Sequence, residues 1–94
     1  MTPEKIKSVC AMYRERFVDA GIPQRRISPS QYPQTQAEML AHAHYLLDDI
    51  ETLSSNPEKI GKTGRHLGSV QALLWVAEWY TLQELMEHNR PDTT

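Results

Sequence analysis

The chain lacks the features that would mark it as a secreted or membrane protein. It contains one cysteine, Cys10, so no disulfide can form within the chain. No apolar run is long enough to cross a membrane, and the N-terminus does not have the pattern of a signal peptide. We therefore expect a soluble protein of the cytoplasm.

The sequence also lacks an excess of positive charge. Its 10 lysines and arginines are outnumbered by 12 aspartates and glutamates, which gives a net charge of −2. Proteins that bind duplex DNA depend on positive charge along its backbone, so this composition argues against that class. Any anionic ligand would have to be bound by a local group of cations.

Residues for metal binding or catalysis are missing as well. His42 and His44 are two positions apart, so on a helix they point to different sides and cannot share a metal. Cys10 lies at an apolar position, where a thiol is normally buried, and no partner base is evident. We expect no metal, no cofactor and no enzymatic activity.

Start signals for helices recur along the chain, whereas strand signals do not. Each signal places a capping residue before a proline, or three positions before a glutamate. These signals are Thr2-Pro3, Thr35-Gln-Ala-Glu38, Asn56-Pro57-Glu58 and Thr81-Leu-Gln-Glu84. The helices that they predict are Pro3 to Ala20, Thr35 to Ser54, Gly61 to Tyr80, and Leu82 to about His88. The expected fold is one all-α domain, residues 1–94, with three main helices and a short C-terminal helix.

A proline-rich connector, residues 21–34, joins the first two predicted helices. It is longer than most loops, and such loops are often functional. It contains Arg25 and Arg26 followed by Ser28, and guanidinium groups bind phosphate with two parallel hydrogen bonds. Adjacent loop arginines are also commonly just solvated. Tyr13, in the first predicted helix, could stack on a base, but a single tyrosine at helical spacing more often belongs to the core.

The stretch Gly61-Lys-Thr63 resembles part of a phosphate-binding P-loop. That motif needs another glycine five positions earlier and a preceding strand. The chain has Asn56 at that position and no strand signal before it. The P-loop interpretation is therefore rejected.

The start of the third predicted helix carries cations instead. Lys59, Lys62 and His66 share a face, and Arg65 lies beside Lys62 near the positive end of the helix dipole. This arrangement suits an anion. A strip without side chains runs along the same helix, formed by Gly61, Gly64 and Gly68. The strip would allow close approach of a flat ligand, or equally the tight packing of another helix.

The third predicted helix is also more apolar than a two-sided contact requires. Between Leu67 and Tyr80 most residues are apolar. Three short partner segments could hardly cover it, so we expect a subunit interface with Trp75 and Trp79 as anchors. The alternative is the core helix of a monomer.

Residues 65–90 resemble a family of small phage proteins, the anti-CBASS sponges that sequester cyclic oligonucleotides. The match covers the C-terminal half of that family's pattern, and Ser69 and Ala72 depart from it. The matching segments are Arg65-His-Leu-Gly68, Val70-Gln71, Leu74-Trp75, Tyr80-Thr81 and Met86-Glu-His-Asn-Arg90.

The resemblance implies a protein of the host cytoplasm that binds its ligand without cleaving it. It implies a homo-oligomer, a hexamer built as a trimer of dimers. Cyclic dinucleotides would bind at Tyr13, Arg25 or Arg26, and Ser28. Cyclic trinucleotides such as cyclic tri-adenylate would bind at Gly61, Lys62, Arg65 and His66. The alternative function is a helical, oligomeric protein-interaction module with no nucleotide ligand.

Overall fold

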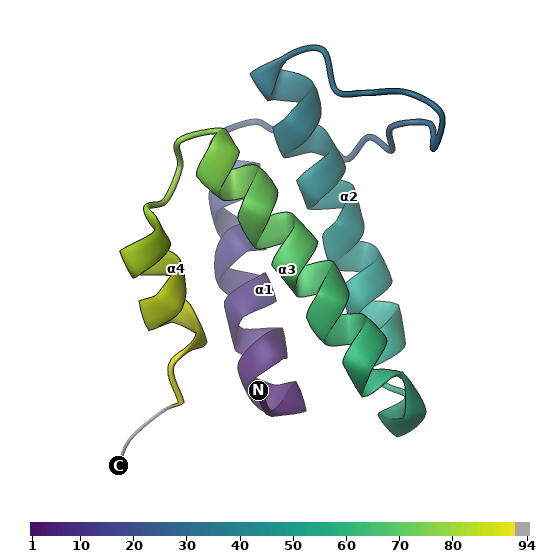
Figure 1. Ribbon diagram of the computed structural model, residues 1–94, viewed down its shortest axis with the longest axis vertical. Coiled ribbons are helices and arrows are strands. Elements are labelled where there is room, and N and C mark those ends of the chain that lie inside the picture. Colours follow the sequence, from purple (N-terminus) through teal and green to yellow (C-terminus); the bar gives the residue numbers. More distant parts are fainter. Residues whose placement is uncertain (92–94) are drawn as a thin grey trace.

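The computed structural model describes residues 1–91 as a helical protein (Figure 1). Its elements are α1 (Pro3–Asp19), α2 (Gln36–Ser54), the 3-10 helix η1 (Pro57–Lys59), α3 (Ile60–Val76) and α4 (Leu82–Asn89). No strand occurs in this part of the chain. The expected all-α class, with three main helices and a short C-terminal one, is confirmed.

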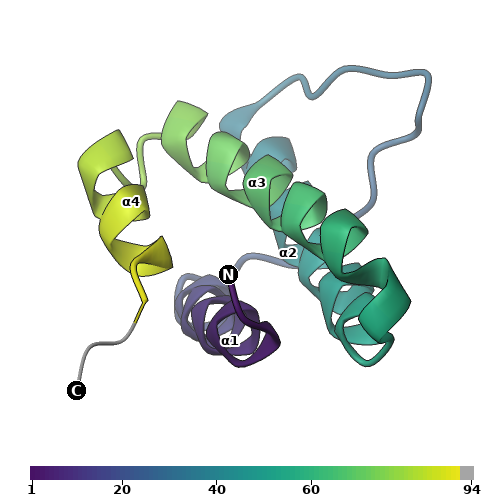
Figure 2. The ribbon, with the colours of Figure 1, turned by 60° about the horizontal axis from the view of Figure 1, so that its bottom comes forward.

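The three long helices form an antiparallel bundle whose members alternate in direction (Figure 1). α2 and α3 pack side by side, and α1 contacts both of them. α4 then returns alongside α1. The connector between α1 and α2 arcs away from the bundle on the side of α2 and α3, as Figure 2 shows.

The helix starts follow from side-chain caps. The Thr2 hydroxyl accepts the Lys5 N–H at 3.1 Å, and Thr81 and Glu84 form a complete capping box with bonds of 3.1 and 3.0 Å. Thr35 accepts the Glu38 N–H at 3.1 Å, but the Glu38 carboxylate accepts from the Gln34 N–H, one residue before the expected partner. The caps read from the sequence are therefore present, one of them in altered form.

The third helix ends earlier than expected, at Val76 rather than Tyr80. Glu78 adopts a left-handed conformation with φ of 64° and donates its N–H to the Trp75 carbonyl at 3.0 Å. The Trp79 N–H then bonds the Leu74 carbonyl at 2.9 Å. These two bonds form the Schellman motif that usually has glycine at the left-handed position. With glutamate there, the sequence carried no stop signal, and the predicted end was wrong.

The core lies where the faces of α1, α2 and α3 meet. The largest fully buried side chains include Tyr13, Phe17, Leu47, Ile50, Leu67 and Leu74. Cys10 is also buried, as expected, and burial raises the pKa of its thiol to about 11. Trp79 is partly buried and packs on Phe17, with ring centroids 5.2 Å apart, so only part of this side chain is left for the interface that we expected.

A partly buried polar network fastens α4 to the bundle. The Tyr13 hydroxyl lies 2.8 Å from Nδ1 of His88 and accepts a hydrogen bond from Nε2 of Gln71 at 3.0 Å. Gln71 and Asn89 exchange two further bonds, of 2.7 and 2.9 Å. The direction of the bond between Tyr13 and His88 depends on the histidine tautomer, and the Tyr13 proton has an acceptor in this network only when Nδ1 of His88 is unprotonated. A neutral His88 with an unprotonated Nδ1 therefore completes the network.

Folding stability should consequently fall in mild acid. Burial lowers the pKa of His88 below its ordinary 6.5; Lys5 lowers it further, while Glu84 and Glu87 oppose the shift. The unfolded chain then binds a proton at higher pH than the folded chain. Stability is complete above the unfolded pKa and decreases as the pH falls towards the folded one. We expect the urea midpoint of unfolding to decrease between about pH 8 and about pH 5.

The matched control is His88→Gln, because glutamine retains polar groups but does not titrate. This variant should be less stable at neutral pH and should lose part of the pH dependence. The other histidines contribute equally to both proteins, so the difference between the two curves reports His88. Parallel curves would show that the Tyr13–His88 bond does not depend on a neutral imidazole.

Candidate functional site

One hollow on the protein lies at the connector. We call it the connector pocket; it has a volume of about 680 Å³ and lies between connector residues 25–34 and the start of α2. Its lining includes Arg25, Arg26, Ser28, Tyr32 and, from α2, Glu38. Three of the residues predicted to contact a dinucleotide, namely both arginines and Ser28, are thus brought together at one pocket.

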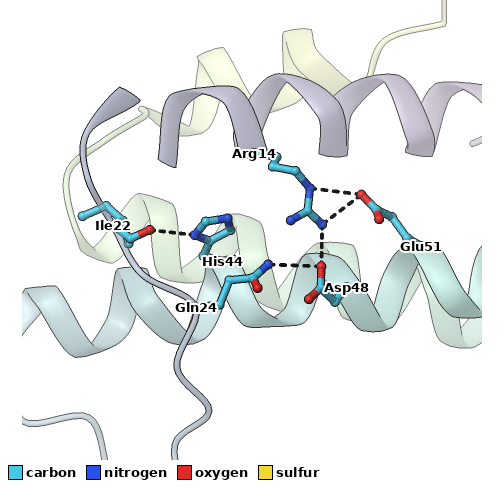
Figure 3. Close-up of polar contacts among 6 residues, drawn as sticks. All are labelled: Arg14, Ile22, Gln24, His44, Asp48 and Glu51. Carbon is cyan, nitrogen blue, oxygen red and sulfur yellow. Dashed lines mark hydrogen bonds and ion pairs between the residues drawn. The ribbon is translucent and has the colours of Figure 1, made fainter. Parts of the chain in front are cut away.

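The start of the connector is fixed to α2 by polar contacts (Figure 3). His44 donates from Nδ1 to the Ile22 carbonyl at 2.8 Å, and the Gln24 amide donates to Asp48 at 3.1 Å. The same Asp48 carboxylate pairs at 2.8 Å with Arg14 of α1, which also binds Glu51. The chain therefore leaves α1 along a defined path over α2.

Two further bonds hold the arginine segment itself. The Arg25 N–H donates to the Ala41 carbonyl at 3.1 Å, and the Ile27 N–H donates to Nδ1 of His42 at 3.1 Å. These bonds lie on either side of Arg26, so the backbone that carries both guanidinium groups is anchored twice to α2. A pre-positioned pair of arginines loses less entropy when it binds a ligand than a mobile pair would.

The electrostatics of the pocket favour an anion. Both arginines are exposed, and within residues 1–91 neither side chain has a hydrogen bond or ion pair. Glu38 is the one carboxylate in the lining, and its bond to the Gln34 N–H occupies it at the start of α2. Burial, and then the nearby Arg26, lower the pKa of His42, which keeps it neutral to accept from Ile27. The ionic side chains thus leave a positive balance.

The structure places the two candidate aromatic residues very differently. Tyr13 is 1% exposed, burial raises the pKa of its phenol to about 12, and its hydroxyl is occupied by Gln71 and His88. Its ring offers no open face to a ligand here. Tyr32 is 83% exposed and lines the connector pocket. We had not singled it out, although an aromatic residue within the same proline-stiffened connector was a usable signal.

The second predicted site lies on the first turns of α3. Gly61, Lys62 and Arg65 are exposed there, and the ring of His66 donates from Nδ1 to the Lys62 carbonyl at 2.9 Å. A Cβ built on Gly61 would lie 3.7 Å from a terminal nitrogen of Arg65, so this guanidinium lies close to the glycine. The four predicted residues therefore cluster on an open helical surface.

The described part of the chain was also compared with the requirements of a metal site and of a membrane-spanning helix. Within residues 1–91 no three histidine, cysteine or acidic side chains come together as a metal site would require. Over the same residues, none of the helices has the length and apolar character needed to cross a membrane. The connector pocket and the basic turns of α3 remain the two candidate ligand sites.

Comparisons of the chain with protein-family models, curated proteins and solved structures found no match. The resemblance to the phage sponges therefore depends on the motifs in residues 65–90 alone, and the site must be argued from its own geometry.

The anchoring of the connector can be tested by proteolysis. His42→Ala removes the acceptor of the Ile27 N–H, so the segment around Arg25 and Arg26 should open more often. Because trypsin cleaves after arginine, limited digestion should cut this variant in the connector several-fold faster than the wild type. His66→Ala is the control, since His66 bonds only within its own helix. Equal connector cleavage in both variants would show that His42 does not hold the segment.

Proposed function

We propose that the protein binds cyclic oligonucleotides and sequesters them intact. One observation carries the proposal: two arginines without ionic partners, a serine hydroxyl and an exposed tyrosine surround one pocket of about 680 Å³. Pockets for small ligands commonly measure roughly 300 to 1,000 Å³. The pocket therefore has a suitable size and a suitable set of side chains for a cyclic dinucleotide.

Each chemical feature of such a ligand has a counterpart in the connector pocket. The two phosphates would be bound by the guanidinium forks of Arg25 and Arg26, which match their oxygens geometrically. Ser28 can donate to a phosphate or sugar oxygen. The Tyr32 ring can stack on a base, replacing Tyr13 in the role we first assigned to it.

The proposed biological role is that of a phage immune-evasion protein in the host cytoplasm. It would compete with a host CBASS effector for its cyclic nucleotide signal by binding alone. The proposed state is a homo-oligomer, with the hexamer of three dimers as the assembly that the resemblance implies.

A second proposed site, for cyclic trinucleotides such as cyclic tri-adenylate, is the cluster on the first turns of α3. Gly61 allows close approach of a ligand, while Lys62, Arg65 and His66 supply donors near the positive end of the helix dipole. Lys62 and Arg65 are exposed and form no ion pair within the described residues. Their charges are therefore available to phosphates.

The competing proposal is a protein-interaction module without a nucleotide ligand. The exposed Trp75 favours it, because 48% of this large side chain is accessible in the protomer. The two proposals differ in one measurement. Calorimetry with cyclic dinucleotides and with cyclic tri-adenylate should give heat for a sponge and none for a pure interaction module. Recovery of unaltered ligand after denaturation would distinguish a sponge from an enzyme.

The first prediction on binding concerns the connector pocket. Arg26→Ala should weaken cyclic dinucleotide binding by about 10- to 100-fold, because a charge-assisted bond contributes roughly 1.5 to 3 kcal/mol. Tyr32→Ala should weaken it by about tenfold through the loss of stacking. Lys7→Ala, on the exposed side of α1, removes the same charge elsewhere and should leave the affinity unchanged. If Lys7→Ala weakens binding as much as Arg26→Ala, the effect is general attraction and not a site.

The second prediction concerns the separation of the two sites. Arg65→Ala should weaken cyclic tri-adenylate binding by about tenfold or more and leave dinucleotide binding intact, whereas Arg26→Ala should do the reverse. Calorimetric titration of each variant with each ligand gives the four affinities. Equal loss of both ligands in both variants would indicate one shared site.

A further inference from the structure

The connector borders a second hollow, which it shares with α2 and α3. We call it the His42 pocket; it has a volume of about 360 Å³, and its lining includes His42 of α2 and Leu73 of α3. The residues that line both this hollow and the connector pocket are Arg26, Ile27, Ser28 and Gln31. The two hollows therefore adjoin each other along one stretch of the connector, on the side of α2 and α3 where it arcs away in Figure 2.

The walls of the His42 pocket are largely apolar. Ile27, Pro29, Pro33 and Leu73 contribute to its lining. Ile27 and Leu73 are only partly buried, so apolar surface is left open to the hollow. Pockets for small ligands commonly measure roughly 300 to 1,000 Å³ and combine apolar walls with a few placed polar groups. The His42 pocket suits a flat ring that carries hydrogen-bonding groups on its edge.

His42 offers this pocket a hydrogen-bond donor whose identity is fixed. The Ile27 N–H donates to Nδ1 of His42 at 3.1 Å, so Nδ1 carries no proton. In a neutral imidazole the proton then lies on Nε2. Within residues 1–91 this Nε2 has no hydrogen-bond partner, and no unpartnered polar side-chain atom there is buried, so Nε2 is open to the surface. The ring is held in place by Tyr45, with centroids 5.9 Å apart.

The other polar groups of the pocket are also able to donate. Arg26 only donates, whereas Ser28 and Gln31 can donate or accept. The described lining contains no carboxylate. Burial, and then the charge of Arg26, lower the pKa of His42, so its imidazole stays neutral at physiological pH. The pocket therefore offers donors in excess of acceptors.

We propose that the His42 pocket receives one base of a bound cyclic dinucleotide and that the Nε2–H of His42 selects guanine there. The inference rests on the proposed nucleotide binding and adds a base preference to it. Arg26 borders both hollows, so a phosphate bound by its guanidinium lies beside the His42 pocket. Tyr32 lines the connector pocket and is left for the other base.

Guanine matches these donors better than adenine does. Its N7 and O6 are adjacent, and both accept hydrogen bonds, whereas adenine has an amino donor beside N7. The Nε2–H of His42 and the amide of Gln31 can donate to the two guanine acceptors. An adenine amino group would instead face the Nε2–H, which has no lone pair to accept from it.

The experiment compares the affinities for cyclic di-GMP and cyclic di-AMP by calorimetry at about pH 7.5, where His42 is neutral. The wild type should bind cyclic di-GMP about 3- to 10-fold more tightly, which corresponds to one neutral hydrogen bond. His42→Asn places an amide oxygen near the position of Nδ1, so it keeps an acceptor for Ile27 but lacks the donor at Nε2. This variant should lose the preference. His42→Gln places an amide N–H near the position of Nε2 and should keep it.

The outcomes separate base selection from nucleotide binding itself. Equal affinities in the wild type, or an unchanged preference in His42→Asn, overturn the inference while the proposed sequestration stands. No heat with either ligand overturns both. A preference that is lost in His42→Gln and kept in His42→Asn would show that His42 acts only by anchoring the connector, and it would reject base selection.

The tautomer of His42 can be tested without a ligand. Long-range nitrogen–proton correlation spectra should show a protonated Nε2 and a bare Nδ1 for His42, and the His42→Asn spectrum identifies its signals. His44 and His66 are internal controls, because their Nδ1 atoms donate to carbonyl groups and should carry the proton. A protonated Nδ1 on His42 overturns the inference. Cyclic di-GMP should shift the His42 Nε2 signal more than cyclic di-AMP does.

Discussion

The hydroxyl group of Tyr13 is the point on which the arrangement of the helices depends. The Tyr13 side chain is buried, and a buried hydroxyl without partners would cost about 1 to 3 kcal/mol. Gln71 of α3 and His88 of α4 satisfy it, and Gln71 in turn fixes Asn89. α4 has eight residues and one buried side chain, Leu85. Apolar contact alone would hold it weakly, so this network positions α4.

The connector pocket depends on α2, whose hydrogen bonds hold the connector in place. α2 contributes Ala43 and Leu47 to the core, while Ala41 and His42 bind the backbone of the connector. Because α2 is packed into the core, it also fixes the connector backbone that carries Arg25 and Arg26. The prolines restrict the backbone conformation of the rest of the connector. Within residues 1–91, Arg25 and Arg26 stay exposed and form no ion pair with nearby acidic side chains.

Local features could be read from the sequence, and long-range ones could not. The threonine caps mark three helix starts because the capping bonds span only three residues. Arg25, Arg26 and Ser28 were predicted together because they are neighbours in the chain. The burial of Tyr13 was not decided locally, since its partners are 58 and 75 residues away. The end of α3 was missed because Glu78 occupies a position that normally requires glycine.

The two proposed ligand sites are formed by different elements. The connector pocket lies between the connector and α2, whereas Gly61, Lys62, Arg65 and His66 lie on the first turns of α3. Three helical glycines cost the protomer about 3 kcal/mol. Completing the burial of three half-exposed apolar side chains would return about the same amount. A chain of 94 residues has a thin margin of stability. In the protomer as described, the glycines of α3 are therefore a net cost.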